Sequence, residues 1–238
     1  FFVWKGHGNA SNRTVEQIKD LQETTNNFLS SIDTNDLICF TDGSVQNPDE
    51  TGLGPCGAGV AIYEFGIANN PTVQSFKVSE KSTPYHGEIM AIKQALVKCL
   101  SLVKKRKRKK IHLLSDCQSA ILTVTSCVPN DNCTQEITDI LKISHDLLSE
   151  GTKTSISWIG GHADIEGNEI SDKAAKEGAL SKDQPLSTST TYKGIKKTIQ
   201  RNSERIWQMT WNNSKTGLHL KEIQDKVSLK ATHALPDN

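Results

Sequence analysis

The chain has 238 residues, of which 35% are hydrophobic and 23% are charged. This is enough apolar material for one folded core, and it excludes a fully disordered chain. No run approaches the roughly 18 consecutive apolar residues of a membrane span, and the first residues lack the charged-then-apolar pattern of a secretory signal. The sequence therefore predicts a cytoplasmic or nuclear protein with no membrane partner.

The formal net charge of +1 conceals one strongly basic run, KKRKRKK, at residues 104–110. A basic run on an otherwise mildly acidic chain suits a polyanionic ligand, although a solvated turn or a nuclear import signal has the same composition. Six cysteines are spread over positions 39, 56, 99, 117, 127 and 133 without a C-x-x-C pair. Neither a zinc site nor a disulfide framework is predicted, so we expect reduced thiols.

The first half of the chain predicts a helix, three strands and a second helix. Apolar residues at helical spacing predict a helical lead-in over 14–30, which ends at the turn residues 33–36. Three segments of strand length follow, at 37–41, 58–63 and 73–78. Residues 85–103 then place apolar side chains three or four positions apart, which predicts a long amphipathic helix.

The second half alternates strands and helices up to a polar segment. The predicted elements are a strand at 111–114, helices at 119–126 and 134–149, a strand at 154–159 and a helix at 168–180. This order predicts an α/β fold with a mixed five-stranded sheet flanked by helices, in which an antiparallel meander precedes parallel crossovers. We expect a helical lead-in or linker at 1–34, a core domain at 35–182, and a linker with a basic helical extension at 183–238.

Four acidic residues occupy positions that an α/β fold would bring together at one edge of its sheet. Asp42 ends the first strand, Glu88 opens the first long helix, Asp116 ends the fourth strand, and Asp172 lies in the last core helix. Taken singly, each is explained by a turn, a helix start or an exposed helix face. Converging carboxylates would repel one another and raise their pKa values unless a divalent cation takes up the charge. Oxygen ligands favour Mg²⁺, with Mn²⁺ as the alternative.

These residues lie in phrases that resemble the type 1 ribonuclease H family, most closely the form attached to reverse transcriptases of non-LTR retroelements. The matching phrases are CFTDGS (39–44), GAGVAI (57–62), HGEIMAIKQAL (86–96), LLSDCQSAI (113–121) and WIGGHADIEGNEISDKAAKEGA (158–179). The resemblance implies a ribonuclease H-like fold and endonucleolytic cleavage of the RNA strand of RNA–DNA hybrids. It also implies an upstream reverse transcriptase domain in the same polyprotein.

The resemblance assigns roles to the acidic residues and to one histidine. It implies two Mg²⁺ ions bridged by Asp42, with Glu88 and Asp116 on the side of the leaving oxygen and Asp172 on the side that activates water. His162 would be the mobile active-site histidine that assists proton transfer or product departure. The glycines that flank it predict a mobile loop.

Substrate-binding residues are implied more weakly. The family uses residues at the positions of Ser44 and Asn168 near the substrate backbone. The family's basic handle is not evident, so the basic run is a candidate substitute, and we expect it to form a flexible, solvated end of the first long helix. Its predicted hybrid contacts are Lys104, Lys105, Arg106, Lys107 and Arg108.

Two alternatives stay open at the level of the sequence. An integrase or transposase of the same fold carries its glutamate on a late helix, whereas Glu88 lies on the first long helix. The other alternative is a catalytically weak nucleic-acid-binding or scaffolding module of a retroelement protein. It is favoured by Asp164 and Glu166, which add negative charge where family members commonly have Gly and Pro.

Overall fold

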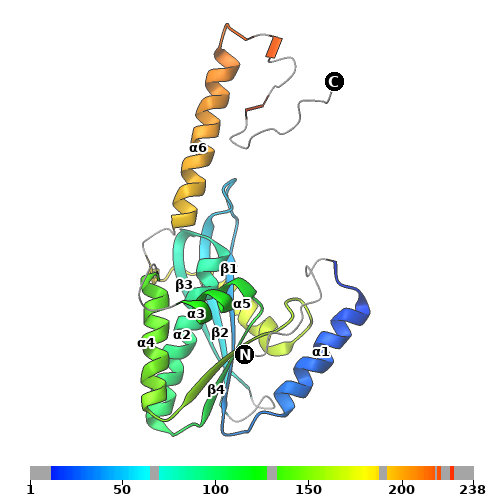
Figure 1. Ribbon diagram of the computed structural model, residues 1–238, viewed down its shortest axis with the longest axis vertical. Helices are drawn as coiled ribbons and strands as arrows, with labels where there is room; N and C mark the ends of the chain where they lie inside the picture. Colours follow the sequence, from blue (N-terminus) through cyan, green and yellow to red (C-terminus); the bar gives the residue numbers. More distant parts are fainter. Residues whose placement is uncertain are drawn as a thin grey trace.

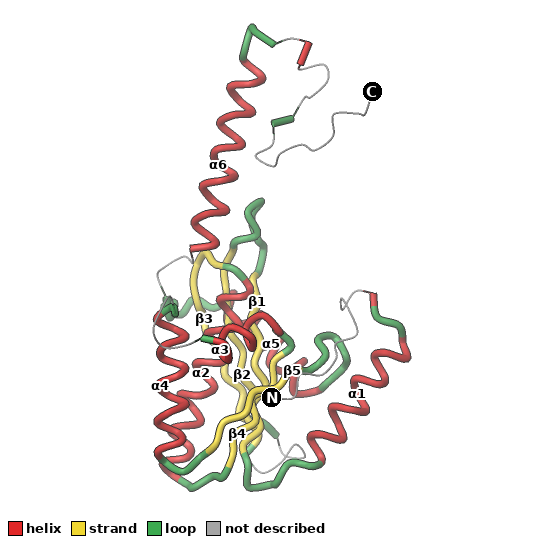
Figure 2. Tube along the Cα trace, in the orientation of Figure 1, coloured by secondary structure: helices red, strands yellow, loops and turns green. Residues whose placement is uncertain are grey.

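The computed structural model describes residues 12–64, 70–127, 133–187, 192–217, 219–220 and 226–227. Its strands form one five-stranded sheet in the order β3-β2-β1-β4-β5 (Figure 2). The strands are β1 (Leu37–Val45), β2 (Gly54–Tyr63), β3 (Thr72–Ser82), β4 (Lys110–Ser115) and β5 (Lys153–Trp158). The β1–β2 and β2–β3 pairs are antiparallel, whereas β1–β4 and β4–β5 are parallel. The predicted mixed sheet, with its meander before the crossovers, is confirmed.

Helices cover both faces of this sheet (Figure 1). They are α1 (Val15–Ser30), α2 (Pro84–Lys105), α3 (Gln118–Ser126), α4 (Gln135–Ser149), α5 (Glu166–Leu180) and α6 (Tyr192–Asn213). Successive side chains of a strand point to opposite faces, and β1 is buried on both. Leu37 and Cys39 therefore pack with α2 and α4, while Ile38 and Phe40 pack on the other face with α1 and with the loop that leads into α5.

The helical lead-in is packed against the sheet rather than loose. Thr14 caps α1 in a reciprocal pair with Gln17, so two backbone N–H groups at the helix start are satisfied. Leu21 and Leu29 are buried in the same cluster as Ile38. The amphipathic pattern of α1 thus buries one face on the domain that follows it.

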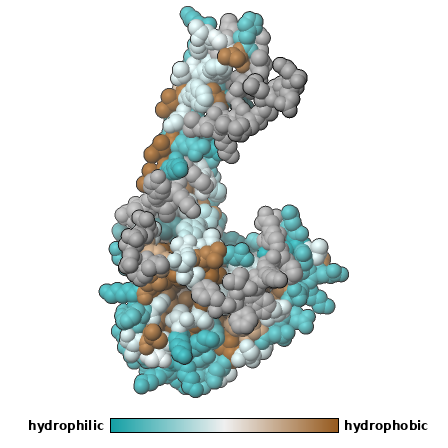
Figure 3. Space-filling model, viewed as in Figure 1, coloured by the Kyte–Doolittle hydropathy of each residue, from teal (hydrophilic) through white to brown (hydrophobic). Residues whose placement is uncertain are grey.

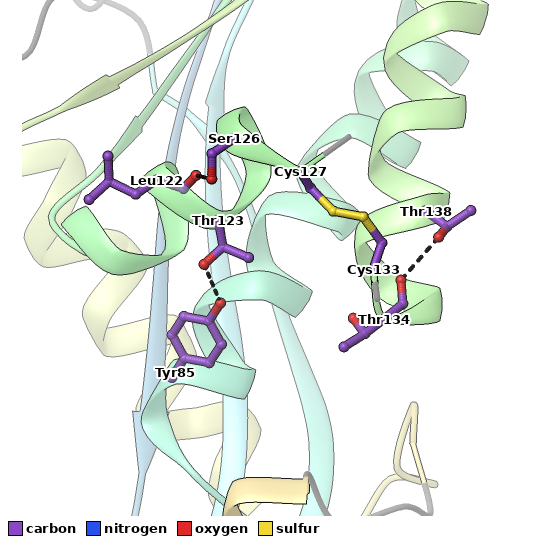
Figure 4. The surroundings of a disulfide bond; sticks show 8 residues. All are labelled: Tyr85, Leu122, Thr123, Ser126, Cys127, Cys133, Thr134 and Thr138. Atoms are coloured by element: carbon purple, nitrogen blue, oxygen red, sulfur yellow. Dashed lines mark hydrogen bonds between the residues drawn. A yellow bond between two sulfur atoms is a disulfide. The ribbon is translucent and has the colours of Figure 1, made fainter. Parts of the chain in front are cut away.

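The expectation of reduced cysteines is wrong for one pair. Cys127, at the C-cap of α3, forms a disulfide with Cys133, just before α4 (Figure 4). Their Cα atoms lie 6.4 Å apart, within the reach of a disulfide. The spacing carries no signal for this bond, because two cysteines six residues apart are bridged only when tertiary packing turns the chain back on itself. Four further cysteines, Cys39, Cys56, Cys99 and Cys117, are free.

After the core, helix α6 lies where the sequence predicts a basic helix, and it extends away from the sheet (Figure 1). Its apolar residues Ile195, Ile199, Ile206 and Met209 are exposed, and apolar surface is visible along the projecting helix (Figure 3). Residues 188–191 of the predicted linker lie outside the described residues. Among the helices described, none is both long and apolar enough to cross a membrane.

Candidate active site

Glycine brings the start of α2 close to β1. Thr83 caps the helix by accepting from the backbone N–H of His86 at 3.3 Å. On β1, a Cβ atom at Gly43 would collide with the backbone of Gly87 and Glu88. Only glycine permits this approach, which places Glu88 beside the end of the strand that carries Asp42.

A second glycine brings α5 to the same place from the other face. Gly59 of β2 lies opposite Asp42 in the antiparallel ladder. A Cβ atom there would collide with the backbone of Ser171 and Ala175 in α5. Close packing of α5 on β2 therefore places Asp172, the residue after Ser171, next to Asp42.

Three of the four predicted carboxylates form one tight cluster. Asp42, Glu88 and Asp116 each offer one carboxylate oxygen, and these oxygens all lie within 4.8 Å of one another. Asp42 and Glu88 are buried, with 7% and 6% of their surfaces exposed, and Asp116 is half-buried. The three residues come from β1, the start of α2 and the end of β4, so the sheet edge gathers them as expected.

The cluster is electrostatically unfavourable when all three groups are ionised. Burial raises the pKa of Asp42 to about 7, and the nearby charge of Asp116 acts in the same direction. Burial raises the pKa of Glu88 well above its usual range, and the charge of Asp42 adds to this effect. Burial also raises the pKa of Asp116, although a hydrogen bond from Asn168 and the charge of His162 oppose it.

These residues fit a hard divalent cation. Among the described residues, Oε2 of Glu88 is a buried oxygen without a hydrogen-bond partner, an arrangement that costs free energy unless another group satisfies it. The three donors are all carboxylate oxygens, which are the ligands that Mg²⁺ and Mn²⁺ prefer. A cation at this position would satisfy the oxygen and offset the mutual repulsion.

Asp172 lies beside the cluster and is also paired with a lysine of its own helix. Its carboxyl group lies close enough to Asp42 to raise the pKa of Asp42. Its Oδ2 atom also accepts from Nζ of Lys176, one turn along α5, at 2.5 Å. Lys176 was not among the predicted site residues, although an acidic and a basic residue four positions apart on a helix are the signal for such a pair.

His162 lies in the loop between β5 and α5, close enough to Asp116 for its charge to act on that carboxylate. Its side chain is exposed, and its backbone has a φ of 53°, as Asp164 has a φ of 52°. The glycines in and beside this loop were predicted to make it mobile, and the structure shows that they also permit close packing. They are buried where a side chain would collide: Gly160 with Leu21, Gly161 with Asp116, and Gly167 with Phe40.

The predicted backbone-contacting residues lie near the cluster in different ways. Asn168 is 3% exposed and lies beside Asp116, where its side chain lowers the pKa of that carboxyl group. Ser44 is buried at the end of β1, and its Oγ accepts from Nε2 of Gln46 at 2.8 Å. Sequence reasoning missed Trp158, whose Nε1 donates to the backbone carbonyl of Asp116 at 2.9 Å. Its only signal was its place in the phrase that ends β5.

The prediction that the whole basic run is solvated is wrong for Arg108. Its side chain is buried, donates to the carbonyl of Glu64 at 2.7 Å, and forms an ion pair with the Glu64 carboxylate at 3.2 Å. A second bond reaches the carbonyl of Asn35 at 3.2 Å. Arg108 therefore joins the segment just before β4 to Glu64 and Asn35. Because its guanidinium is buried in these contacts, the prediction that Arg108 contacts the hybrid is wrong.

The other predicted contacts in the run are exposed, but they lie far from the carboxylates. Lys104 and Lys105 end α2, whereas Glu88 lies near its start. At about 1.5 Å per residue, Lys104 lies about 24 Å from Glu88 along the helix. Lys110 likewise begins β4, whose far end leads to Asp116. The run is at the opposite end of the sheet from the candidate site.

A mixed sheet of this order, with carboxylates gathered where β1 and β4 end and α2 begins, defines the class of ribonuclease H-like folds. The chain belongs to the RNase H family, whose family model, described as RNase H, matches residues 34–180. It is therefore a ribonuclease H by family, a hydrolase. No curated protein sequence matches the chain.

Several solved structures are similar in fold. One is LC11-RNase H1 in complex with an RNA/DNA hybrid, at 19% identity and a TM-score of 0.46, covering 61% of this chain and 99% of that chain. Another is RNase H1 from the halophilic archaeon Halobacterium salinarum NRC-1, at 17% identity and a TM-score of 0.43, covering 60% and 96%. A third is LC9-RNase H1, at 17% identity and a TM-score of 0.48, covering 67% of this chain and 80% of that chain.

Proposed function

We propose that this protein hydrolyses the RNA strand of RNA–DNA hybrids as an endonuclease. The observation that carries the proposal is the cluster of Asp42, Glu88 and Asp116, in which Oε2 of Glu88 is buried without a partner. A chain of the RNase H family that keeps three converging carboxylates keeps the part of the fold that holds a divalent cation.

Two Mg²⁺ ions are the proposed cofactor, held by Asp42, Glu88 and Asp116 together with Asp172. When bound, such ions lower the pKa of a water molecule and neutralise charge that develops on the phosphate and the leaving oxygen. Asn168 and Trp158 keep Asp116 in place through its carboxylate and its backbone carbonyl. The exposed imidazole of His162 would carry a proton to or from the reacting oxygens, and the products would be a 3′-hydroxyl and a 5′-phosphate.

A cleavage assay on a labelled hybrid tests this proposal. The full chain, incubated with Mg²⁺, should cut the RNA strand of an RNA–DNA hybrid and leave single-stranded RNA, duplex RNA and duplex DNA intact. EDTA should abolish the cleavage, and added Mn²⁺ should restore it. Cleavage that persists in EDTA, or that is equal on duplex RNA, would contradict the proposal.

A second candidate is a module that binds nucleic acid but cleaves it weakly. The observation that favours it is the pairing of Lys176 with Asp172, because a carboxylate engaged by an ammonium group is a poorer metal ligand. Asp164 and Glu166, both exposed near the site, would also repel phosphates. Hybrid binding without cleavage in the same assay would favour this candidate.

We infer from the matching phrases that the chain is the ribonuclease H part of a retroelement polyprotein, with a reverse transcriptase domain upstream. The phrases HGEIMAIKQAL and WIGGHADIEGNEISDKAAKEGA support this inference. Sequencing the full transcript tests it, since a reverse transcriptase reading frame should precede this segment.

Replacing His162 by alanine should slow turnover without weakening metal binding. The histidine is exposed in a loop and is not one of the clustered carboxylates, so its loss removes a proton carrier but no ligand. We expect a decrease in the cleavage rate of about 100-fold. Single-turnover cleavage and calorimetric titration with Mg²⁺ measure the two effects. The control is His145→Ala, an exposed histidine on α4, and an equal loss of metal affinity in His162→Ala would contradict the role.

Replacing Lys104, Lys105, Arg106 and Lys107 by serine should weaken hybrid binding only for long hybrids. A duplex that reaches from the carboxylates to these residues needs about seven base pairs, at about 3.4 Å per pair over about 24 Å. For every phosphate that is no longer neutralised, the salt slope should flatten by about 0.9. Fluorescence anisotropy across a salt series measures this. A variant with arginine at 104, 105 and 107 keeps every charge and should bind normally, whereas weaker binding of short hybrids by the serine variant would refute the placement.

A further inference from the structure

Helix α1 contacts the loop that carries His162, which we call the His162 loop (residues 160–165). Leu21 of α1 packs directly on Gly160, since a Cβ atom there would lie 2.8 Å from its Cδ1 atom. Arg13, the residue before the N-cap of α1, donates from its guanidinium to the carbonyl of Gly161 at 2.5 Å. Gly161 immediately precedes His162, so α1 reaches the backbone that presents the imidazole.

Arg13 also contacts Trp158 at the end of β5. The guanidinium carbon lies 5.9 Å from the centroid of the Trp158 ring, which is a cation–π distance. Gly161 and Trp158 both touch Asp116. Gly161 packs against the Asp116 carboxylate, and Trp158 donates to its backbone carbonyl at 2.9 Å. The side chain of Arg13, just before α1, thus contacts the His162 loop and two residues that touch Asp116.

The backbone of the His162 loop needs such support. His162 and Asp164 both adopt positive φ, a left-handed conformation that is unfavourable for a residue with a Cβ atom. Such residues stay in place only where the surrounding structure determines their position. Gly167 against Phe40 holds the side of the loop near α5, and Arg13 with Leu21 holds the side near α1.

We propose that α1 is an accessory element of the active site and that Arg13 is a positioning residue for the His162 loop. Arg13 and α1 lie outside residues 34–180, the part that matches the RNase H family. The contact with the His162 loop is therefore made by the segment that precedes the family match. The effect of Arg13 on kcat can be tested only if the protein cleaves hybrids as proposed above. The effect of Arg13 on the structure of the His162 loop can be tested without cleavage.

The test uses the full chain with Arg13→Ala, Arg13→Lys and the control Lys19→Ala, which removes one exposed positive charge from α1. Arg13→Ala should lower kcat about 10-fold, within the loss that a misplaced catalytic group can cause. KM and the salt slope of binding should stay unchanged, because Arg13 acts on the loop and not on the substrate. Arg13→Lys should recover part of the rate, since it keeps a charged donor for Gly161 but loses the planar group over Trp158. Lys19→Ala should behave as the wild type.

Hydrogen–deuterium exchange supplies a readout that is independent of cleavage. In Arg13→Ala, the amides of the His162 loop should exchange faster while those of β1 and β2 stay unchanged. A raised KM with a flatter salt slope would overturn the proposal, because Arg13 would then contact phosphate directly. Unchanged loop exchange, or faster exchange across the whole sheet, would also overturn it. If the wild type does not cleave hybrids, the proposed function fails, but the exchange comparison still decides the role of Arg13.

Discussion

Asp116→Asn should abolish hybrid cleavage while the protein remains folded. The change keeps the shape of the side chain and an oxygen that can accept from Asn168, but it removes a negative charge from the cluster with Asp42 and Glu88. We expect a rate loss well above 100-fold, since losing even an outer partner of a metal ligand costs about 10–100-fold. Single-turnover cleavage of a labelled hybrid measures the loss.

The same substitution should stabilise the metal-free protein. Burial raises the pKa of Asp116, which means that its ionised form is disfavoured in the folded state. A neutral amide removes this penalty, so the midpoint of thermal unfolding in EDTA should rise. The control is Asp146→Asn on α4, which lies outside the cluster and should change neither cleavage nor the midpoint. Cleavage retained in Asp116→Asn would mean that the metal site is wrongly placed.

The metal-free protein should lose stability as the pH rises from about 4 to about 7, and Mg²⁺ should restore it. Asp42 has a pKa raised from 3.8 to about 7, so the folded state binds more protons than the unfolded state between these values. The contribution of Asp42 to the free energy of unfolding therefore falls as the pH rises through this window and levels off above it. For Asp42 alone the loss amounts to about 4 kcal/mol, and the raised pKa values of Glu88 and Asp116 act with the same sign.

Urea unfolding at a series of pH values, with EDTA or with Mg²⁺, measures this dependence. Mg²⁺ should have its largest effect above pH 7, where Asp42 is ionised and binds it best. The variant Asp42→Asn should flatten the pH dependence in EDTA and weaken the response to Mg²⁺. Stability in EDTA that rises between pH 4 and pH 7 would show that the cluster does not govern the pH dependence.

Much of the fold could be predicted from the chain alone, because most of its elements are amphipathic and end at turn residues. The long helix after the meander was predicted at 85–103 and lies at Pro84–Lys105. The first strand was predicted to end at residue 41, but it continues to Val45, because backbone pairing of Ser44 with Gly57 extends the ladder without apolar side chains. The disulfide between Cys127 and Cys133 had no local signal, since it depends on how α3 and α4 approach each other.

The sequence by itself determined which acidic residues are the candidates for the chemistry of this protein. Asp42 and Asp116 were predicted to follow short apolar strands and Glu88 to open a helix, and these expectations came from local periodicity and from motif spacing. Local pattern also predicted the sheet, because antiparallel neighbours and parallel crossovers follow from the order and length of the elements.

Only the tertiary structure decided which side chains meet. The basic run lies one helix length from the site because α2 starts near Glu88 and ends at Lys105, and Arg108 is buried on Glu64 rather than solvated. Arg13 reaches the His162 loop although it is 148 positions from Gly161 in the chain. Spacing along a sequence reports neighbours within one element, whereas contacts between distant segments are set by how their surfaces pack.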